Sequence, residues 1–418
     1  MTSGRTLAFA LGLSLAVAGL ARAQPVEIEY WQYTFAQRVQ AIDELIKRFE
    51  AANPGIKVKH THVPYDDFRL KLAAAIPAGQ GPDVVQLFYG WLQDYLKAGL
   101  LQPLPPDQFD PAEIDREFFP LVRQMKVNGQ YYAVPTAVRS LALFWNKKLF
   151  RDAGLDPARP PQTLDELVDT AKKLTTRDAG GHLVQAGIAL DMGLQDHHWL
   201  REVLIRQMGG QPYSTDGRTV AYNGPSGVRA VTWYTDLALR HKVGEFGFLT
   251  DGVTAFRSGK AGLMIDGSFR LAAFDGQAGL DYGVAELPAY EGKRANFASY
   301  WVNGITPRAT GAKKDAAAKF VRFITTPAAM ELWLEKVGEL PARKAVAERD
   351  SVRTHPKYGA FIRGLSYAEA TFFVNETAQR KLFMDMVDRI ALTGQPVADA
   401  VAQAAAEEQK LLDAFFSR

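Results

Sequence analysis

The sequence predicts an α/β protein large enough for two domains. In the first quarter of the chain, strand-like and helix-like segments alternate, a rhythm typical of a parallel sheet covered by helices. The chain has 418 residues, which is more than one hydrophobic core normally serves. Its 47% hydrophobic and 23% charged residues are those of a globular protein in water.

Hydrophobic periodicity, together with residues that begin or end helices, predicts the first strands and helices of the chain. The opening strand leads into Trp31-Gln32-Tyr33, Asn53-Pro54-Gly55 ends the first helix, and Asp66 stands where it can cap the second. In order, the sequence predicts strands at 26–30, 56–61 and 83–87, and helices over 39–49, 66–76 and 90–98.

The middle of the chain continues the same alternation. Tyr132-Ala133-Val134-Pro135 leads into an apolar strand over 141–146. Thr163-Leu164-Asp165-Glu166 has the form of a capping box and precedes a helix that carries apolar residues from Leu167 to Leu174.

Residues 251–274 contain the most informative stretch. A short helix through Thr254 to Phe256 ends where Ser258-Gly259 can take a positive φ. The apolar run Ala261–Ile265 is long enough for a buried strand and too short for a helix. The turn Asp266-Gly267-Ser268 follows, and Asp266 or Ser268 is expected to cap a helix that begins near Phe269. Ligands bind at such a carboxyl edge in open α/β sheets.

The N-terminus has the pattern of a secretion signal. Arg5 supplies the positive charge, residues 7–20 form the apolar core, and Ala21-Arg22-Ala23 offers a cleavage site before Gln24. This apolar run is shorter than the roughly 20 residues of a membrane span. The alternative is a retained interfacial anchor. We expect cleavage after Ala23 and a periplasmic protein.

Composition narrows the functional classes. Removing Arg5 and Arg22 from the 49 basic residues leaves 47 against 46 acidic ones, a balance that gives no reason to expect nucleic acid as a partner. The chain has no cysteine, which excludes disulfides, thiol nucleophiles, thiolate metal sites and a lipid-modified cysteine anchor.

Several blocks resemble the maltose-binding-like family, the extracellular sugar-binding proteins of ATP-driven importers. The resemblance spans about residues 28–346, with Leu164 and Phe269 standing where the family usually has tryptophan. Each block is weak alone, but their order is specific. The blocks are DVVQLFYGWLQDYLKAGLLQPL (83–104), YAVP (132–135), LALFWNKKLFRDAGLDP (141–157), PQTLDEL (161–167), FRSGKAGLMIDGSF (256–269) and ITPRATGAKKDAAAKFVRFITTPAAMELWLEKVGELPAR (305–343).

This resemblance implies a type II periplasmic-binding-protein fold, in which two α/β lobes hold the ligand in a cleft between them and close about a three-segment hinge. It implies a monomer without cofactor that delivers its ligand to the permease subunits of an ABC importer. By position, we expect the chain to pass from one lobe to the other near 135–141, 297–301 and 338–342. We expect a last helix over 398–415. The lobes would comprise 24–136 with 301–338, and 140–297 with 341–418.

A sugar site needs flat aromatic platforms and planar polar groups. The candidates stand at predicted strand ends and at the hinge crossings. Some of them are chosen because the resembled family has ligand contacts at those positions. Packing in the core is the alternative for every aromatic, above all Trp91 and Trp199, and Asp66 has its capping role. The candidates are Trp31, Gln32, Tyr33, Tyr65, Asp66, Phe88, Tyr89, Trp91, Arg139, Trp199, Asp266, Ser268, Phe269, Arg270, Tyr300, Trp301, Asn303 and Arg343.

The arginines keep a second ligand class open. Arg139, Arg270 and Arg343 can make bidentate contacts to a carboxylate or phosphate, or they can pair with Asp83, Asp266 or Glu339 and brace the hinge. We favour bracing for Arg343 and leave the other two open. The alternative ligand is an anion of the glycerol-phosphate type, which relatives in the resembled family bind.

Two further classes are weighed, and a secreted glycosidase is kept as the alternative of a different class. A secreted glycosidase needs a carboxylate pair, and such pairs occur by chance among 46 acidic residues. The chain has no G-x-S-x-G, S-x-x-K or H-E-x-x-H sequence, and residues 252–260 fail the P-loop spacing, so no catalytic residue is assigned. Metal transport would rest on His60 with His62 and on His197 with His198, and no third ligand stands at a definite spacing, so no metal site is assigned.

Overall fold

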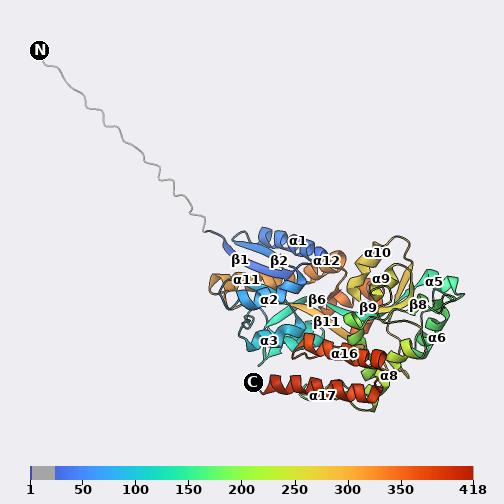
Figure 1. The fold of residues 1–418 in the computed structure, drawn as a ribbon. Helices are drawn as coiled ribbons and strands as arrows, with labels where there is room; N and C mark the ends of the chain where they lie inside the picture. Colours follow the sequence, from blue (N-terminus) through green and yellow to red (C-terminus); the bar gives the residue numbers. More distant parts are fainter. Residues whose placement is uncertain (2–23, 418) are drawn as a thin grey trace.

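The computed structural model describes Met1 and residues 24–417, apart from the side chains of Asp66, Leu194 and Gln195. The predicted secretion signal and its cleavage site lie outside this range. The expected α/β class is confirmed, because helices cover a mixed sheet (Figure 1). No helix in the described range is long and apolar enough to span a membrane.

The strands are β1 (Val26–Tyr33), β2 (Ile56–Val63), β3 (Val84–Phe88), β4 (Lys126–Val127), β5 (Gln130–Tyr131), β6 (Ala133–Asn146), β7 (Thr176–Arg177), β8 (Leu183–Ile188), β9 (Ala261–Gly267), β10 (Tyr282–Ala285), β11 (Asn296–Ile305), β12 (Leu340–Pro341) and β13 (Ala368–Glu369).

The α-helices are α1 (Ala36–Ala52), α2 (Tyr65–Ala75), α3 (Leu92–Lys97), α4 (Pro111–Glu117), α5 (Lys147–Asp152), α6 (Leu164–Leu174), α7 (Ile205–Gln207), α8 (Pro225–Leu239), α9 (Gly252–Arg257), α10 (Leu271–Asp275), α11 (Ala312–Ile324), α12 (Pro327–Val337), α13 (Lys344–Ala347), α14 (Asp350–Arg353), α15 (Tyr358–Gly364), α16 (Glu376–Thr393) and α17 (Val397–Phe416). The 3₁₀ turns are η1 (Tyr89–Trp91), η2 (Pro120–Met125), η5 (Ser268–Arg270) and η6 (Leu365–Tyr367), and the π-helical turns are η3 (Met192–Asp196) and η4 (Trp199–Leu204).

The main sheet has the strand order β2-β1-β3-β11-β6-β9-β8-β7. Strands β1, β2 and β3 are parallel, as the alternation of strands and helices predicts, whereas β11 runs antiparallel to both β3 and β6. We call the part built around β1, β2 and β3 the first lobe, and the part built around β7, β8 and β9 the second lobe. Figure 1 shows them on opposite sides of β6 and β11.

Strand β6 links the two lobes. Its residues from Ala133 to Ser140 pair with β11, and those from Leu141 onward pair with β9 and β10. The short strand β12 also pairs with β6, at Ala137 and Val138. Every residue of β6 except Arg139 is buried, so the linking strand lies in the hydrophobic core.

The chain returns to the first lobe after β11, where α11 packs on β1 and α12 packs on α1. Helix α17 packs against α8 and α16 of the second lobe, and its end reaches α3 of the first lobe (Figure 1). There the Lys97 ammonium donates to the backbone carbonyl of Phe415 and lies 3.4 Å from the centroid of its ring.

The capping predictions had different outcomes. At α6 the Thr163 cap is confirmed, because its hydroxyl accepts from the Glu166 amide at 3.1 Å, whereas the Glu166 carboxylate accepts from the amide of Gln162, one residue before the cap. The prediction for Asp66 is wrong, because α2 begins at Tyr65, with Pro64 at its cap position. The prediction that Asp266 or Ser268 caps the following helix is also wrong. The chain enters η5 before α10, and the Asp266 carboxylate accepts from the Gly267 amide and the Arg270 side chain.

The core of the second lobe gives a direct test of the packing. Phe144 of β6 is fully buried, and its ring lies 5.4 Å from Phe274 and 5.8 Å from Phe361, centroid to centroid. Phe144→Ala should lower the free energy of unfolding by about 3–5 kcal/mol in urea titrations, because a cavity replaces the ring. Leu392→Ala, at a residue 79% exposed, should change it by less than about 0.5 kcal/mol. Equal losses would contradict the packing.

Candidate ligand-binding site

Five of the predicted aromatic residues lie together, and we call them the aromatic cluster: Tyr33, Tyr65, Phe88, Trp91 and Trp301. Trp301 is central to it, with its ring centroid 4.2 Å from Tyr33, 5.5 Å from Trp91 and 5.7 Å from Phe88. The Tyr65 ring lies 5.6 Å from Tyr33 and 6.3 Å from Trp301, and this residue is 45% exposed. Tyr65 therefore gives the cluster an exposed aromatic surface.

The ends of the parallel strands bring the cluster together. Tyr33 and Phe88 are the last residues of β1 and β3, and Tyr65 begins the helix that follows β2. Carboxyl ends of neighbouring parallel strands lie at one sheet edge, so side chains remote in sequence meet there. Trp301 comes from β11, beside a register shift between Trp301 and Val302 in the pairing with β6. Such irregularities redirect side chains.

A buried carboxylate lies beneath the cluster. Glu339 forms ion pairs with both Arg38 and Arg139, and it accepts a hydrogen bond from the Trp333 indole at 2.8 Å. The Arg38 guanidinium lies over the rings of Tyr33 and Trp301, at 4.9 and 5.2 Å from their centroids. These contacts fix the positions of two rings of the cluster.

Burial and charge act in opposite directions on this group. Burial alone would raise the pKa of Glu339, but the charges of Arg139 and Arg38 lower the pKa to about 2. The pKa of Arg139 is raised, because Glu339 and Tyr33 outweigh the burial that disfavours its charge. Both groups are therefore charged at neutral pH.

The second lobe contributes the turn after β9. The Arg270 Nε donates to Asp266 at 2.8 Å. The Phe269 ring lies 4.7 Å from the Arg139 guanidinium and 4.8 Å from that of Arg270. Ser268 is buried, and its hydroxyl has no hydrogen-bond partner among the described residues. Arg270 also lines a cavity of about 490 Å³ together with Asp191, Asp251 and Arg257.

The aromatic cluster is also close to the start of α16 in the second lobe. Burial and the nearby Glu376 carboxylate raise the pKa of Tyr65, and the charges of Arg380 and Arg139 oppose this rise. The charges at the start of α16 in the second lobe therefore act on a tyrosine of the first lobe.

Other candidates make structural contacts instead. Asn303 accepts from the Tyr30 hydroxyl at 3.1 Å and donates to Thr136. The Gln32 side chain lies 3.0 Å from the His60 ring, and Trp31 donates to Glu29 at 2.8 Å. The hydrogen bonds of these side chains therefore go to residues outside the aromatic cluster. Tyr300 stacks on Tyr89 at 4.6 Å, and its hydroxyl donates to the backbone carbonyl of Leu121.

Three further candidates do not belong to the aromatic cluster: Trp199, Asp66 and Arg343. Trp199 is 1% exposed and packs edge-on against Trp233 and Tyr234, so the structure places it in the core. The side chain of Asp66 lies outside the described part. Arg343 pairs with Glu117 and with Glu113, and its Nε donates to the Thr325 carbonyl at 2.9 Å. These are bracing contacts.

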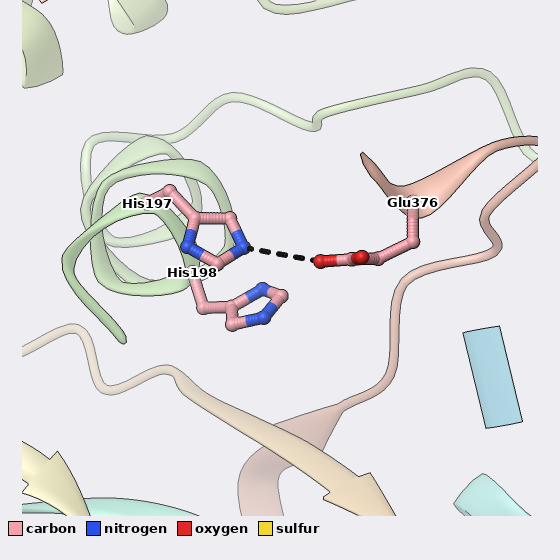
Figure 2. A group of neighbouring side chains, drawn as sticks. All are labelled: His197, His198 and Glu376. Carbon is pink, nitrogen blue, oxygen red and sulfur yellow. Dashed lines mark ion pairs between the residues drawn. The ribbon is translucent and has the colours of Figure 1, made fainter. Parts of the chain in front are cut away.

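The two histidine pairs differ. His60 has partners at both ring nitrogens, with Asp43 at 2.7 Å from Nδ1 and Gln32 at 3.0 Å from Nε2. Figure 2 shows the other pair, with the rings of His197 and His198 turned toward Glu376. Burial and the neighbouring cationic groups hold the pKa of His198 well below its ordinary value. Burial raises the pKa of Glu376, while Arg380 and Arg201 lower it.

Sequence reasoning missed Arg38 and Glu376. The signal for Arg38 was present, because positions 38, 42, 45 and 49 share one face of α1 and the other three are apolar. No comparable signal marked Glu376, which lies beyond the last block of the family resemblance.

The family model for bacterial extracellular solute-binding proteins matches residues 35–331. The chain belongs to this family. A maltotriose-binding protein from Pyrococcus abyssi is 25% identical over 82% of this chain and 72% of its own length. The sn-glycerol-3-phosphate-binding periplasmic protein UgpB of Escherichia coli is 27% identical over 81% of this chain and 79% of its own.

Solved structures establish the fold. A cyclic α-maltosyl-1,6-maltose binding protein from Arthrobacter globiformis superposes with a TM-score of 0.80 at 23% identity, over 93% of this chain and 100% of its own. UgpB from Mycobacterium tuberculosis, in complex with glycerophosphocholine, also gives 0.80 at 23% identity, over 93% and 98%. The expected type II periplasmic-binding-protein fold is thereby confirmed.

The buried carboxylate predicts a defined acid sensitivity. Because the pKa of Glu339 is lowered on folding from 4.5 to about 2, its stabilising contribution is complete above pH 4.5 and is lost as the pH falls toward 2. Glu339→Gln should lower the free energy of unfolding at pH 7 by about 3–5 kcal/mol, because two arginines lose a buried partner.

Urea titrations between pH 7 and 2 check both parts. The variant should lose less stability than the wild type below pH 4.5. Glu331→Gln, which breaks an exposed pair between the middle of α12 and Arg349, should cost less than about 1 kcal/mol at pH 7. Indistinguishable pH profiles for the wild type and Glu339→Gln would contradict the assignment.

Proposed function

We propose that this chain is the periplasmic substrate-binding component of an ABC importer and that it captures a neutral saccharide, a di- or oligosaccharide. The main observation in support of this proposal is the aromatic cluster at the carboxyl ends of β1 and β3. Aromatic faces pack against the C–H faces of sugar rings, and the polar groups beside them bind hydroxyls. Membership of the solute-binding family supports capture without chemical turnover.

Hinge closure is the proposed mechanism. The first lobe comprises residues 24–136 and 301–338, the second 140–297 and 341–418, and the crossings are near 135–141, 297–301 and 338–342. Strands β6, β11 and β12 occupy these crossings, which supports the assignment. A saccharide that contacts both lobes shifts the population toward the closed form by its difference in affinity for the two forms. The permease subunits in the membrane recognise that form, and the protein acts as a monomer.

The pairing of the arginines supports a neutral ligand. Arg139 is paired with Glu339, Arg270 with Asp266, and Arg343 with Glu113 and Glu117. A bound phosphate would have to share these cations with carboxylates already in contact with them. Repulsion between the phosphate and the carboxylates would oppose such binding.

A glycerol-phosphate-type ligand is the second candidate. The observation that favours it is the likeness to the two UgpB proteins. This alternative requires that Arg139 or Arg270 leaves its carboxylate for the ligand. Binding would then weaken with salt and be lost in Arg270→Ala.

A thermal-shift screen separates these candidates. The panel contains mono- and oligosaccharides, glycerol phosphates and glycerophosphocholine. A ligand at 100 times its dissociation constant adds about 2.7 kcal/mol, and so raises Tm by a few degrees. Shifts with neutral saccharides alone support the proposal, and shifts with phosphate esters alone overturn it. Release of reducing ends from a bound oligosaccharide would indicate a secreted glycosidase instead.

Tyr65 offers a specific test of the aromatic cluster. Tyr65→Ala should weaken saccharide binding at least about tenfold, roughly 1.4 kcal/mol, because an exposed aromatic face is lost while the core is unchanged. Leu70→Ala on the same helix removes a residue that is 74% exposed and should leave affinity unchanged. Calorimetric titration measures both. Equal affinity of Tyr65→Ala and wild type would place the ligand elsewhere.

A further inference from the structure

A buried group of metal-binding side chains lies in the second lobe beside β11. His197 and His198 stand between the two π-helical turns η3 and η4, and Glu376 is the first residue of α16. Figure 2 shows both imidazole rings directed toward the Glu376 carboxylate. One ligand atom from each of the three residues lies within 4.8 Å of the others, and all three residues are buried.

The spacing fits an ion between the groups better than a direct hydrogen bond. The His197 Nε2 lies 4.0 Å from the nearer Glu376 oxygen, beyond hydrogen-bond range. Zinc binds nitrogen and oxygen at about 2.0–2.2 Å, so ligand atoms on a tetrahedral ion lie about 3.4 Å apart. The three ligand atoms, now within 4.8 Å of one another, would draw closer together on binding the ion.

The surroundings hold His198 in place as a ligand. Its ring stacks on Phe297 at 3.9 Å, with the two planes 9° apart. Its Nδ1 is buried and has no hydrogen-bond partner among the described residues. A buried polar atom without a partner is costly unless it binds something.

Two arginines near the group have to be reconciled with a cation. Arg201 pairs with Glu408 at 3.1 Å, and both side chains are fully buried, so this charge is neutralised by its own partner. Arg380 lies 3.7 Å from Glu376, but its side chain is 32% exposed. It can turn toward solvent and leave the carboxylate to the ion.

We propose that His197, His198 and Glu376 bind one divalent transition-metal ion of the zinc class, with a fourth position open to water. Two imidazoles and a carboxylate suit zinc or cobalt and do not suit calcium or magnesium. The ion would tie the start of α16 to the turn between η3 and η4. It would thereby stiffen the part of the second lobe that faces Tyr65, whichever ligand the protein carries.

Zinc binding to the chelator-treated full chain, prepared without a histidine tag, tests the proposal. Calorimetry should show one equivalent of zinc bound, and saturating zinc should raise Tm by a few degrees. Cobalt in place of zinc should give the visible absorption of a four-coordinate site. Absence of zinc binding to the wild type overturns the proposal.

Matched variants locate the site. His198→Phe keeps the stack on Phe297 and removes both nitrogens, and Glu376→Gln keeps the shape and removes the charge. Each should weaken zinc binding at least about tenfold, a loss typical of disrupted metal sites. Circular dichroism without metal confirms that each is folded. His62→Ala, at the other histidine pair, should bind zinc like the wild type. Retained binding in both His198→Phe and Glu376→Gln, or loss in His62→Ala, overturns the assignment.

Discussion

The ion-paired Glu339 is the constraint on which the candidate site depends. Its partners come from three parts of the chain: Arg38 lies in the first turn of α1, Arg139 lies in the linking strand β6, and Trp333 lies in α12. A carboxylate with no exposure to water is stable as a charge only when opposite charges and hydrogen bonds surround it. Its position between α12 and β12 therefore fixes how α1 and β6 sit at the junction of the lobes.

That arrangement also determines what kind of ligand the site favours. With one carboxylate between two guanidiniums, the group beneath the aromatic cluster has a net charge of +1, and the Arg38 guanidinium lies over the rings of Tyr33 and Trp301. Each cation already has a carboxylate partner, Tyr33, Trp91 and Trp301 are buried, and the exposed aromatic face is that of Tyr65. Such a surface suits a neutral molecule with apolar faces and many hydroxyls, which is the chemistry of a saccharide.

Local signals in the sequence predicted much of the fold. The Thr163 cap of α6 and the apolar run of β9 depend on neighbouring residues alone, and both were confirmed. Most strand-end positions of the aromatic cluster followed from the alternation of strands and helices. The pairing of Arg139 with Glu339 was among the alternatives that the sequence left open.

Features that depend on distant parts of the chain could not be predicted in this way. The register shift beside Trp301 arises from the pairing of β11 with β6. Asp266 did not cap α10, because its carboxylate accepts from Arg270 and the next amide instead. Glu376 meets His197 and His198 only through packing of α16 on the second lobe, across a sequence separation that carries no periodic signal.

The salt dependence of saccharide affinity tests the central claim most directly. The claim is that the arginines near the aromatic cluster serve the protein's own carboxylates and that the ligand is neutral. Calorimetric titration of a neutral oligosaccharide at low and at high salt should give the same dissociation constant, because no net charge is exchanged on binding. Binding that is confined to a phosphate ester and falls steeply with salt would contradict the account and assign the arginines to the ligand.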